Sequence, residues 1–197
     1  FHTVFQPFHK RFVLDLRRYQ LKQLPKYIIN KLIGNAALAL GQYRSLRHID
    51  PERVERLIFV CRGNVCRRPY AEAAAKKRGL QAISCGVAVS RSAPAELTGI
   101  RAALLRGKDI SDHMSRSIHD IQITPTDLLV AMDPSHLPVA RDTASRLGWQ
   151  VTLLGLWISP SLMEITDPYG KSIDTFHQCF EQIDEGLMGL SKCLGLR

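Results

Sequence analysis

Apolar and polar positions form short alternating blocks from about residue 56 onward. Four runs rich in apolar residues are predicted as strands, at 57–60, 81–84, 127–132 and 150–154. Helix-compatible stretches lie between and after them, at 70–78, 94–106, 134–147 and 173–190. Strands that alternate with helices of this length indicate a parallel sheet covered on both faces. The pattern therefore predicts an α/β domain over residues 51–197, with a doubly wound, parallel four-stranded sheet.

Residues 1–50 have a different character. Aromatic and leucine residues at helical spacing predict a helix that ends at Pro25, and a second helix-compatible segment covers 27–43. The segment holds nine Lys or Arg and two Asp, a net charge of +7, whereas the whole chain of 197 residues carries +9. We therefore expect a basic, helical N-terminal extension that contacts another subunit, the main domain or an anionic membrane surface. Nucleic acid is not expected, because no DNA-reading motif is present.

Composition limits the remaining function classes. A hydrophobic content of 45% with 23% charged residues is ordinary for a folded globular protein. No apolar run approaches the roughly 20 residues that span a bilayer, and basic residues interrupt any signal-like segment near the N-terminus. The five cysteines are an odd, scattered set, which indicates reduced thiols. These features predict a cytoplasmic protein, at most peripheral at the membrane.

The junction between the first strand and its helix carries the candidate chemistry, with the sequence Cys61-Arg62-Gly63-Asn64-Val65-Cys66-Arg67. A loop at a helix N-terminus presents free backbone N–H groups and the positive end of the helix dipole, which bind an oxyanion such as phosphate. Gly63 lets the backbone approach the anion, and Arg67 can bind two of its oxygens. The same field favours a Cys61 thiolate, which is a nucleophile. Taken singly, Cys61 reads as a structural thiol and Arg67 as a surface residue; their placement after a strand favours the anion site.

A longer pattern extends this loop, namely Val60-Cys61-x-Gly63-Asn64-x-Cys66-Arg67-x-Pro69-x-Ala71-Glu72. A second motif precedes the last helix and reads Asp167-Pro168-Tyr169-Gly170. Together they resemble the signature of the low-molecular-weight protein tyrosine phosphatases, bacterial type. Shorter matches follow the family's order at Ser84-Cys85-Gly86, His113-Met114-Ser115-Arg116 and 128–133. The resemblance covers about residues 54–192 and leaves the basic extension unmatched.

The resemblance implies hydrolysis of phosphotyrosine in proteins through a cysteinyl-phosphate intermediate, with no metal and no cofactor. Cys61 would attack phosphorus, Arg67 would neutralise the phosphoryl charge, and Asp167 would protonate the leaving phenolate and then activate water. The residues implied to bind phosphate or substrate are Arg62, Gly63, Asn64, Val65, Cys66, Arg68 and Tyr169. His113 and Ser84 would support the loop. The implied partner is a phosphotyrosine-containing protein, such as a bacterial tyrosine kinase of polysaccharide export.

Several features leave alternatives open. Cys66 matches a cysteine that can trap an oxidised nucleophile as a reversible disulfide, which predicts redox sensitivity. Arg68 stands where the family usually has Ser, whose lost hydroxyl raises the pKa of the nucleophile unless the guanidinium compensates. Arg62 is also unusual at its position. The competing hypotheses are a thiol-coupled arsenate reductase, whose relay cysteines have no mid-chain match; a protein-arginine phosphatase, which tends to have Thr at the position of Val65; and a phosphate-binding module with weakened catalysis.

Overall fold

The computed structural model describes residues 33–34, 36–61, 63–145, 148 and 150–195. The chain divides into two compact units, Phe1–Gln42 and Tyr43–Arg197. In the first unit, the described residues are helical up to 39 and end in a turn at Gly41, where φ is +73°. The helices predicted before residue 33 lie outside the described residues.

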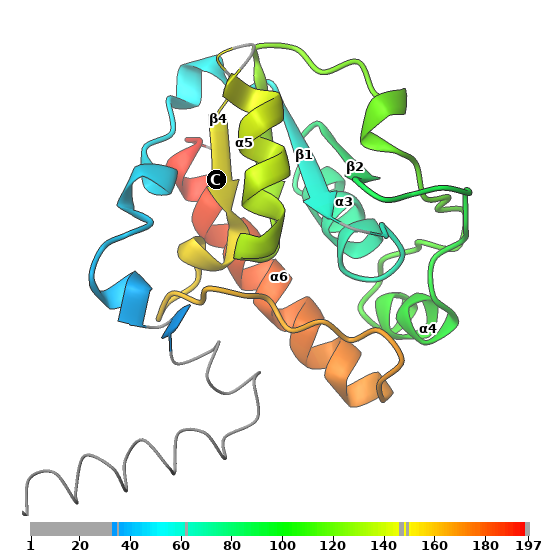
Figure 1. The fold of residues 1–197 in the computed structure, drawn as a ribbon. Helices are drawn as coiled ribbons and strands as arrows, with labels where there is room; N and C mark the ends of the chain where they lie inside the picture. The colour runs from blue at the N-terminus through cyan, green and yellow to red at the C-terminus, as the bar shows by residue number, and fades with distance from the viewer. Residues whose placement is uncertain (1–32, 35, 62, 146–147, 149, 196–197) are drawn as a thin grey trace, which may run out of the picture. The chain divides into compact units, whose positions relative to one another are not determined.

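The second unit is built on a parallel sheet whose strands are β1 (Arg56–Cys61), β2 (Ala82–Gly86), β3 (Asp127–Ala131) and β4 (Gln150–Leu153). Their order is β2-β1-β3-β4 (Figure 1). Val60 pairs with Cys85 on one side and with Ala131 on the other. The carboxyl ends of three strands therefore meet at one edge of the sheet, next to Cys61. The predicted four-stranded parallel sheet is confirmed.

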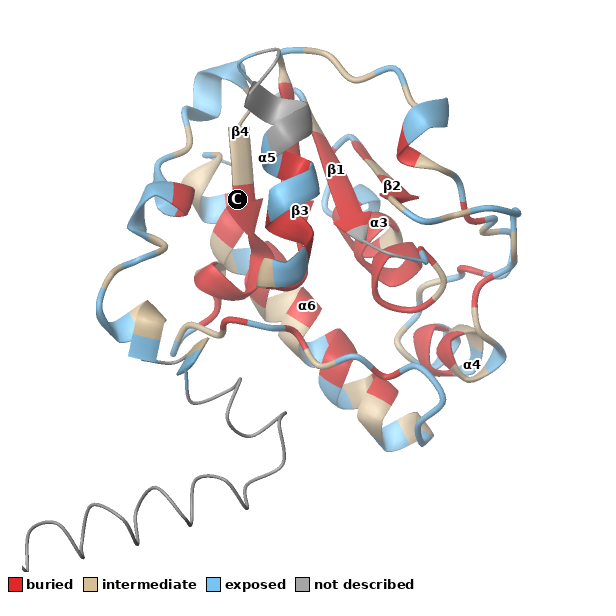
Figure 2. Ribbon diagram, in the orientation of Figure 1, coloured by how far each residue is buried: buried red, intermediate tan, exposed pale blue. Residues whose placement is uncertain are grey.

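Helices cover both faces of this sheet. They are α3 (Arg67–Lys77), α4 (Leu97–Leu105), α5 (Leu137–Ser145) and α6 (Ile173–Cys193). Leu57 and Phe59 of β1 join the core formed with α3 and α6, whereas Ile58 and Val60 join a smaller core with Ala140 of α5. Both faces of β1 are thus buried (Figure 2), which explains its continuous apolar run. The doubly wound arrangement is confirmed.

Three helices begin at residues that differ from the predicted ones. α3 begins at Arg67 instead of residue 70. Pro69 is compatible with this start, because the N–H that proline lacks has no intrahelical partner in the first turn of a helix. α4 begins at Leu97 instead of residue 94, because the side chain of Glu96 caps it by accepting a hydrogen bond from the Gly99 nitrogen at 3.0 Å. The segment Pro134–His136 forms a 3-10 turn before α5.

Part of the predicted extension packs along the edge strand β4. Leu46 is buried in the 3-10 turn Arg44–Arg47, and its carbonyl accepts a hydrogen bond from Thr152 Oγ1 at 2.7 Å. The backbone N–H of Asp50 donates to Gln150 Oε1 at 2.5 Å, and Gln150 Nε2 donates back to the Asp50 carbonyl at 3.0 Å. Residues 44–50 therefore cover a sheet edge that would otherwise expose unpaired backbone groups.

Candidate active site

The candidate loop joins the carboxyl end of β1 to the N-terminus of α3. Arg62 and the side chain of Cys61 lie outside the described part of the chain. A Cβ atom placed on the exposed Gly63 would meet nothing within 4 Å, so this side of the loop is open. Cys66 precedes α3 and makes no side-chain capping hydrogen bond. The first N–H groups of α3 therefore keep their capacity to bind an anion.

Hydrogen bonds from neighbouring elements hold the loop in an unusual conformation. Asn64 has φ +55°, in the left-handed region that a non-glycine residue rarely adopts. Its Nδ2 donates to the Ser84 carbonyl at 3.3 Å, and its own carbonyl accepts from His113 Nε2 at 3.1 Å. The Ser84 hydroxyl donates instead to Glu72 Oε2 of α3, at 2.6 Å. The structure thus brings the predicted loop-support residues His113 and Ser84 to the loop, together with Glu72, which sequence reasoning missed.

His113 supports the loop as a neutral imidazole. Burial lowers its pKa, although the hydrogen bond to Asn64 and the charge of Glu72 act in the opposite direction. A neutral ring that donates through Nε2 leaves Nδ1 unprotonated. The brace therefore depends on one tautomer and adds no positive charge beneath the loop.

Arg67 lies at the centre of the site and is almost fully buried. Its Nη1 donates to the Ile165 carbonyl at 3.0 Å, and its Nη2 donates to Asp167 Oδ2 at 2.9 Å. Asp133 Oδ2 lies 3.5 Å from Nη1. The fold therefore joins the predicted phosphate ligand and the predicted acid, which are 100 residues apart in the sequence.

Asp167 lies between the buried Arg67 and solvent. Its side chain is 49% exposed, and its Oδ1 accepts a hydrogen bond from the Tyr169 backbone nitrogen at 3.2 Å. Tyr169 is 68% exposed, so its ring is free to contact a molecule that approaches from solvent. The Asp-Pro-Tyr segment thus presents a carboxyl group and an aromatic ring on the outer side of Arg67.

Asp133 and His136 form a buried pair that sequence reasoning did not assign. Asp133 Oδ2 lies 2.9 Å from His136 Nδ1. Burial would raise the pKa of Asp133, but bonding to His136 and Ser135 and the charge of Arg67 outweigh it and lower this pKa to about 2. Asp133 is therefore a permanent carboxylate at the site. The available signal was its place immediately after a buried strand, at the carboxyl edge of a parallel sheet.

Two buried cysteines, Cys66 and Cys179, lie beside the site, and their raised pKa values distinguish them from a thiolate nucleophile. Burial raises the pKa of each to about 12, and the charge of Asp167 adds to the effect, while Arg67 opposes it. Both are therefore protonated thiols at neutral pH. Cys66 stays in the loop as predicted, whereas Cys179 reaches the site from α6.

Val65 and Arg68 were both predicted to bind phosphate or substrate, and the structure places Val65 partly buried and Arg68 buried. The Val65 carbonyl accepts a hydrogen bond from the Glu96 nitrogen at 3.0 Å, which ties the loop to the start of α4. Arg68 is 1% exposed. The Arg68 side chain is therefore closed to solvent, and the assignment of Val65 to the phosphate site stays a prediction.

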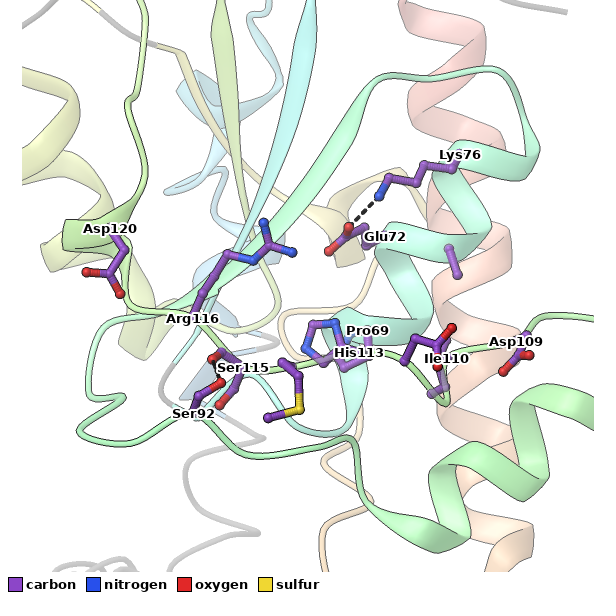
Figure 3. Close-up of a pocket in the computed structure, with 13 residues that line it drawn as sticks. Pro69, Glu72, Lys76, Ser92, Asp109, Ile110, His113, Ser115, Arg116 and Asp120 are labelled. Carbon is purple, nitrogen blue, oxygen red and sulfur yellow. Dashed lines mark hydrogen bonds and ion pairs between the residues drawn. The ribbon is translucent and has the colours of Figure 1, made fainter.

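A hollow of about 670 Å³ lies beside the loop, between α3 and the segment that follows α4 (Figure 3). Its lining includes Glu72 and Lys76 of α3, which form an ion pair at 2.5 Å, and the ring of His113. Arg67, Asp167 and Tyr169 are not among the described residues that line it. The hollow is therefore adjacent to the candidate site through His113 and does not contain its chemistry.

The protein is a parallel α/β fold whose β1–α3 loop leads into a helix without a side-chain cap, an arrangement that can bind an oxyanion. The model of the family "Low molecular weight phosphotyrosine protein phosphatase" matches residues 56–196. The chain belongs to this family, and residues 1–55 lie outside the match.

Curated relatives and solved structures agree with this family. The chain is 29% identical over 140 residues to the low molecular weight protein-tyrosine-phosphatase Etp of Escherichia coli (strain K12), covering 70% of this chain and 93% of that protein. It is 31% identical over 143 residues to the protein-arginine-phosphatase of Bacillus subtilis (strain 168), covering 70% and 95%. The structure of Vibrio vulnificus Wzb in complex with benzylphosphonate aligns with a TM-score of 0.61 at 26% identity, covering 71% and 99%.

Proposed function

We propose that this chain hydrolyses phosphotyrosine in proteins through a cysteinyl-phosphate intermediate. The observation that carries the proposal is the 2.9 Å contact between Arg67 Nη2 and Asp167 Oδ2, beside the loop that follows β1. It supports a site in which a phosphate ligand and a proton donor act on the same group. The family, and relatives named as tyrosine phosphatases, support phosphotyrosine as the substrate class.

In the first step, the Cys61 thiolate attacks phosphorus, a sulfur–phosphorus bond forms and the bond to the tyrosine oxygen breaks. Arg67 and the N–H groups at the start of α3 neutralise the charge on the phosphoryl oxygens. The incoming phosphate competes with Asp167 for Arg67. Asp167, released from this ion pair, takes up a proton from solvent and delivers it to the departing phenolate oxygen.

In the second step, Asp167 is a carboxylate again and removes a proton from water. This water attacks phosphorus, the sulfur–phosphorus bond breaks, and inorganic phosphate leaves with Cys61 restored as a thiolate. Tyr169, exposed beside Asp167, stacks on the ring of the phosphotyrosine. Asp133, a carboxylate with a pKa of about 2, keeps Arg67 in place and exchanges no proton in the working pH range.

The test is turnover of a phosphotyrosyl peptide by the full chain, with a metal chelator present. We expect Cys61→Ser to lower kcat by about 10⁴-fold or more and Asp167→Ala to lower it by about 10² to 10⁴-fold. Cys193→Ser and Asp174→Ala serve as matched controls, because these residues lie on α6 and form no hydrogen bond or ion pair with the described residues of the loop; both should keep wild-type turnover. Wild-type activity in Cys61→Ser would refute the mechanism.

A second candidate is hydrolysis of phosphoarginine in proteins, favoured by the 31% identity to the protein-arginine-phosphatase. The same panel of variants is assayed on a phosphoarginyl peptide. A kcat/KM at least tenfold higher for phosphoarginine than for phosphotyrosine would make phosphoarginine the preferred substrate. A tenfold ratio corresponds to about 1.4 kcal/mol of transition-state preference.

We further propose that the protein substrate is a bacterial tyrosine kinase of polysaccharide export. We also propose a second part, a cytoplasmic location in which the basic segment 1–50 contacts a membrane surface or another subunit. The charge of that segment supports the second part. No helix among the described residues is long and apolar enough to cross a membrane. Cosedimentation of the full chain, and of a variant that lacks residues 1–32, with phosphatidylserine vesicles tests the membrane contact. Equal sedimentation of both would refute it.

A further inference from the structure

Asp133 and His136 face each other across the 3-10 turn Pro134–His136, next to Arg67. Asp133 caps this turn, because its Oδ1 accepts a hydrogen bond from the Ser135 nitrogen at 2.9 Å, and its carbonyl accepts one from the His136 nitrogen at 3.3 Å. Residues three apart in a 3-10 turn lie on the same side, so the His136 ring comes beside the Asp133 carboxylate. Since the cap holds Oδ1, Oδ2 is the oxygen that remains for other groups.

Oδ2 of Asp133 has two basic neighbours, and neither satisfies it completely. Arg67 Nη1 lies 3.5 Å away and donates its hydrogen bond to the Ile165 carbonyl, at 3.0 Å. His136 Nδ1 lies 2.9 Å away, but the direction of the ring N–H misses the oxygen, so Nδ1 is buried with no hydrogen-bond partner in the described part of the chain. A buried donor without a partner costs free energy. His136 therefore has an unsatisfied donor beside an oxygen that it shares with Arg67.

A bound phosphate changes the charge around this oxygen. In the proposed reaction Arg67 donates to phosphoryl oxygens, so its positive charge is divided between the phosphate and Asp133. A buried carboxylate that loses part of its cation is destabilised unless another donor replaces it. His136 Nδ1, already 2.9 Å from Oδ2, can complete that hydrogen bond by a change in ring angle, without movement of the backbone.

We propose that His136 is a positioning residue for phosphate binding, whose Nδ1–H bonds Asp133 Oδ2 when a phosphoryl group engages Arg67 and so stabilises the phosphate-bound state. His136 acts through Asp133 and does not touch the phosphate. The inference rests on the proposed function, since it takes Arg67 as the phosphate ligand. A neutral ring protonated at Nδ1 and an imidazolium both supply the donor, so no proton is transferred.

The test is the affinity of the full chain for inorganic phosphate, measured by isothermal titration calorimetry. His136→Leu removes the donor and should raise the Kd about tenfold, near the low end of what one hydrogen bond to a charged group contributes. His136→Asn carries an amide N–H near the position of Nδ1 and should restore the Kd to within about threefold of wild type. His119→Leu, on the exposed side of the 3-10 turn Ile118–Asp120, is the matched control and should leave the Kd unchanged.

A second background separates action through Asp133 from a packing effect. In an Asp133→Asn protein, His136→Leu should change the Kd by less than about twofold, because the carboxylate that His136 bonds is absent. An equal, tenfold effect in both backgrounds would overturn the proposal, as would a His136→Asn protein that binds phosphate as weakly as His136→Leu. Should His136→Leu not fold, His136→Gln, whose amide lies one carbon further from the backbone, is judged by the same criteria.

Turnover gives a further readout, the division of the effect between KM and kcat. The donor acts whenever a phosphoryl group engages Arg67, in the substrate complex and in the transition state alike. His136→Leu should therefore raise KM for a phosphotyrosyl peptide about as much as it raises the Kd of phosphate, and should leave kcat within about twofold of wild type. A loss confined to kcat would contradict the assigned role.

Phosphate binding needs no turnover, so the two proposals fail separately. A wild-type chain that hydrolyses no phosphopeptide, but whose Kd for phosphate depends on His136 as described, would refute the proposed function and support this inference. A chain with full turnover and a Kd that His136→Leu does not move would refute the inference alone.

Discussion

The two ends of strand β1 carry arginines whose hydrogen bonds are completed to different degrees. At the amino end, Arg56 Nε and Nη2 bind both oxygens of Asp127 at 2.7 and 2.8 Å, and Nη2 also donates to the Gln122 carbonyl at 2.9 Å. At the carboxyl end, Arg67 bonds a carboxylate that is half exposed, and Nε and Nη2 of Arg68 have no hydrogen-bond partner among the described residues. The first arrangement is a bidentate ion pair closed within the fold, whereas the second keeps donors available for a ligand.

The difference teaches how the same residue type serves stability or binding. A bidentate ion pair within the fold already occupies both oxygens of its carboxylate and two nitrogens of its guanidinium, so it gains little from a bound molecule. Unpaired donors beside a buried site lower the stability of the free protein and are satisfied when an anion enters. The amino end of β1 should therefore control folding, and the carboxyl end should control activity.

The largest effect that would sharpen this comparison is expected at Arg67. Arg67→Lys keeps the charge but loses the fork that binds two oxygens, so kcat/KM for a phosphotyrosyl peptide should fall by about 10² to 10³-fold. Tm should change little, because the lysine can still face Asp167. Arg101→Lys, exposed on α4, is the control. Turnover within a few-fold of wild type would show that Arg67 is structural, like Arg56.

A smaller effect, of the opposite kind, is expected at the amino end. Arg56→Met leaves the Asp127 carboxylate buried and should lower the free energy of unfolding by about 2 kcal/mol, a value reduced from that of a fully buried pair because the Arg56 side chain is 30% exposed. Urea denaturation measures it. The kcat/KM should stay at the wild-type value; a loss of activity without a loss of stability would break the distinction between the two ends.

The smallest effect concerns the acid stability of the carboxyl end. The pKa of Asp133 is lowered to about 2, against about 3.9 in an unfolded chain. The carboxylate therefore stabilises the fold above about pH 4, and this contribution disappears as the pH falls toward 2. The free energy of unfolding of the wild type should fall between pH 4 and pH 2.5, and that of Asp133→Asn should fall by about 1 kcal/mol less over the same interval. An equal loss of unfolding free energy in the two proteins between these pH values, measured by urea denaturation, would contradict the assignment.

Local sequence was sufficient to predict the sheet and the helices that cover it, because the apolar spacing within each segment indicates whether it is a strand or a helix. β1 reads as a continuous apolar run, and burial on both of its faces is the reason. Boundaries were less predictable at α3 and α4, where a proline and a glutamate cap act within a single turn. Residues 44–50 fall within the predicted extension, and the bond between Thr152 Oγ1 and the Leu46 carbonyl is a contact with β4 that no local pattern predicts.

For the candidate site, the sequence by itself determined the loop after β1, the Asp-Pro-Tyr segment and therefore the family, because these motifs are contiguous and their chemistry follows from residue type. Only the tertiary structure decided which groups meet. It paired Arg67 with Asp167 and Asp133, and it placed the Ser84 hydroxyl on Glu72. It also buried Arg68, two of whose donor atoms have no partner in the described part of the chain. Such partnerships depend on which loops a parallel sheet brings to its carboxyl edge, and residues far apart in the chain carry no local signal of that proximity.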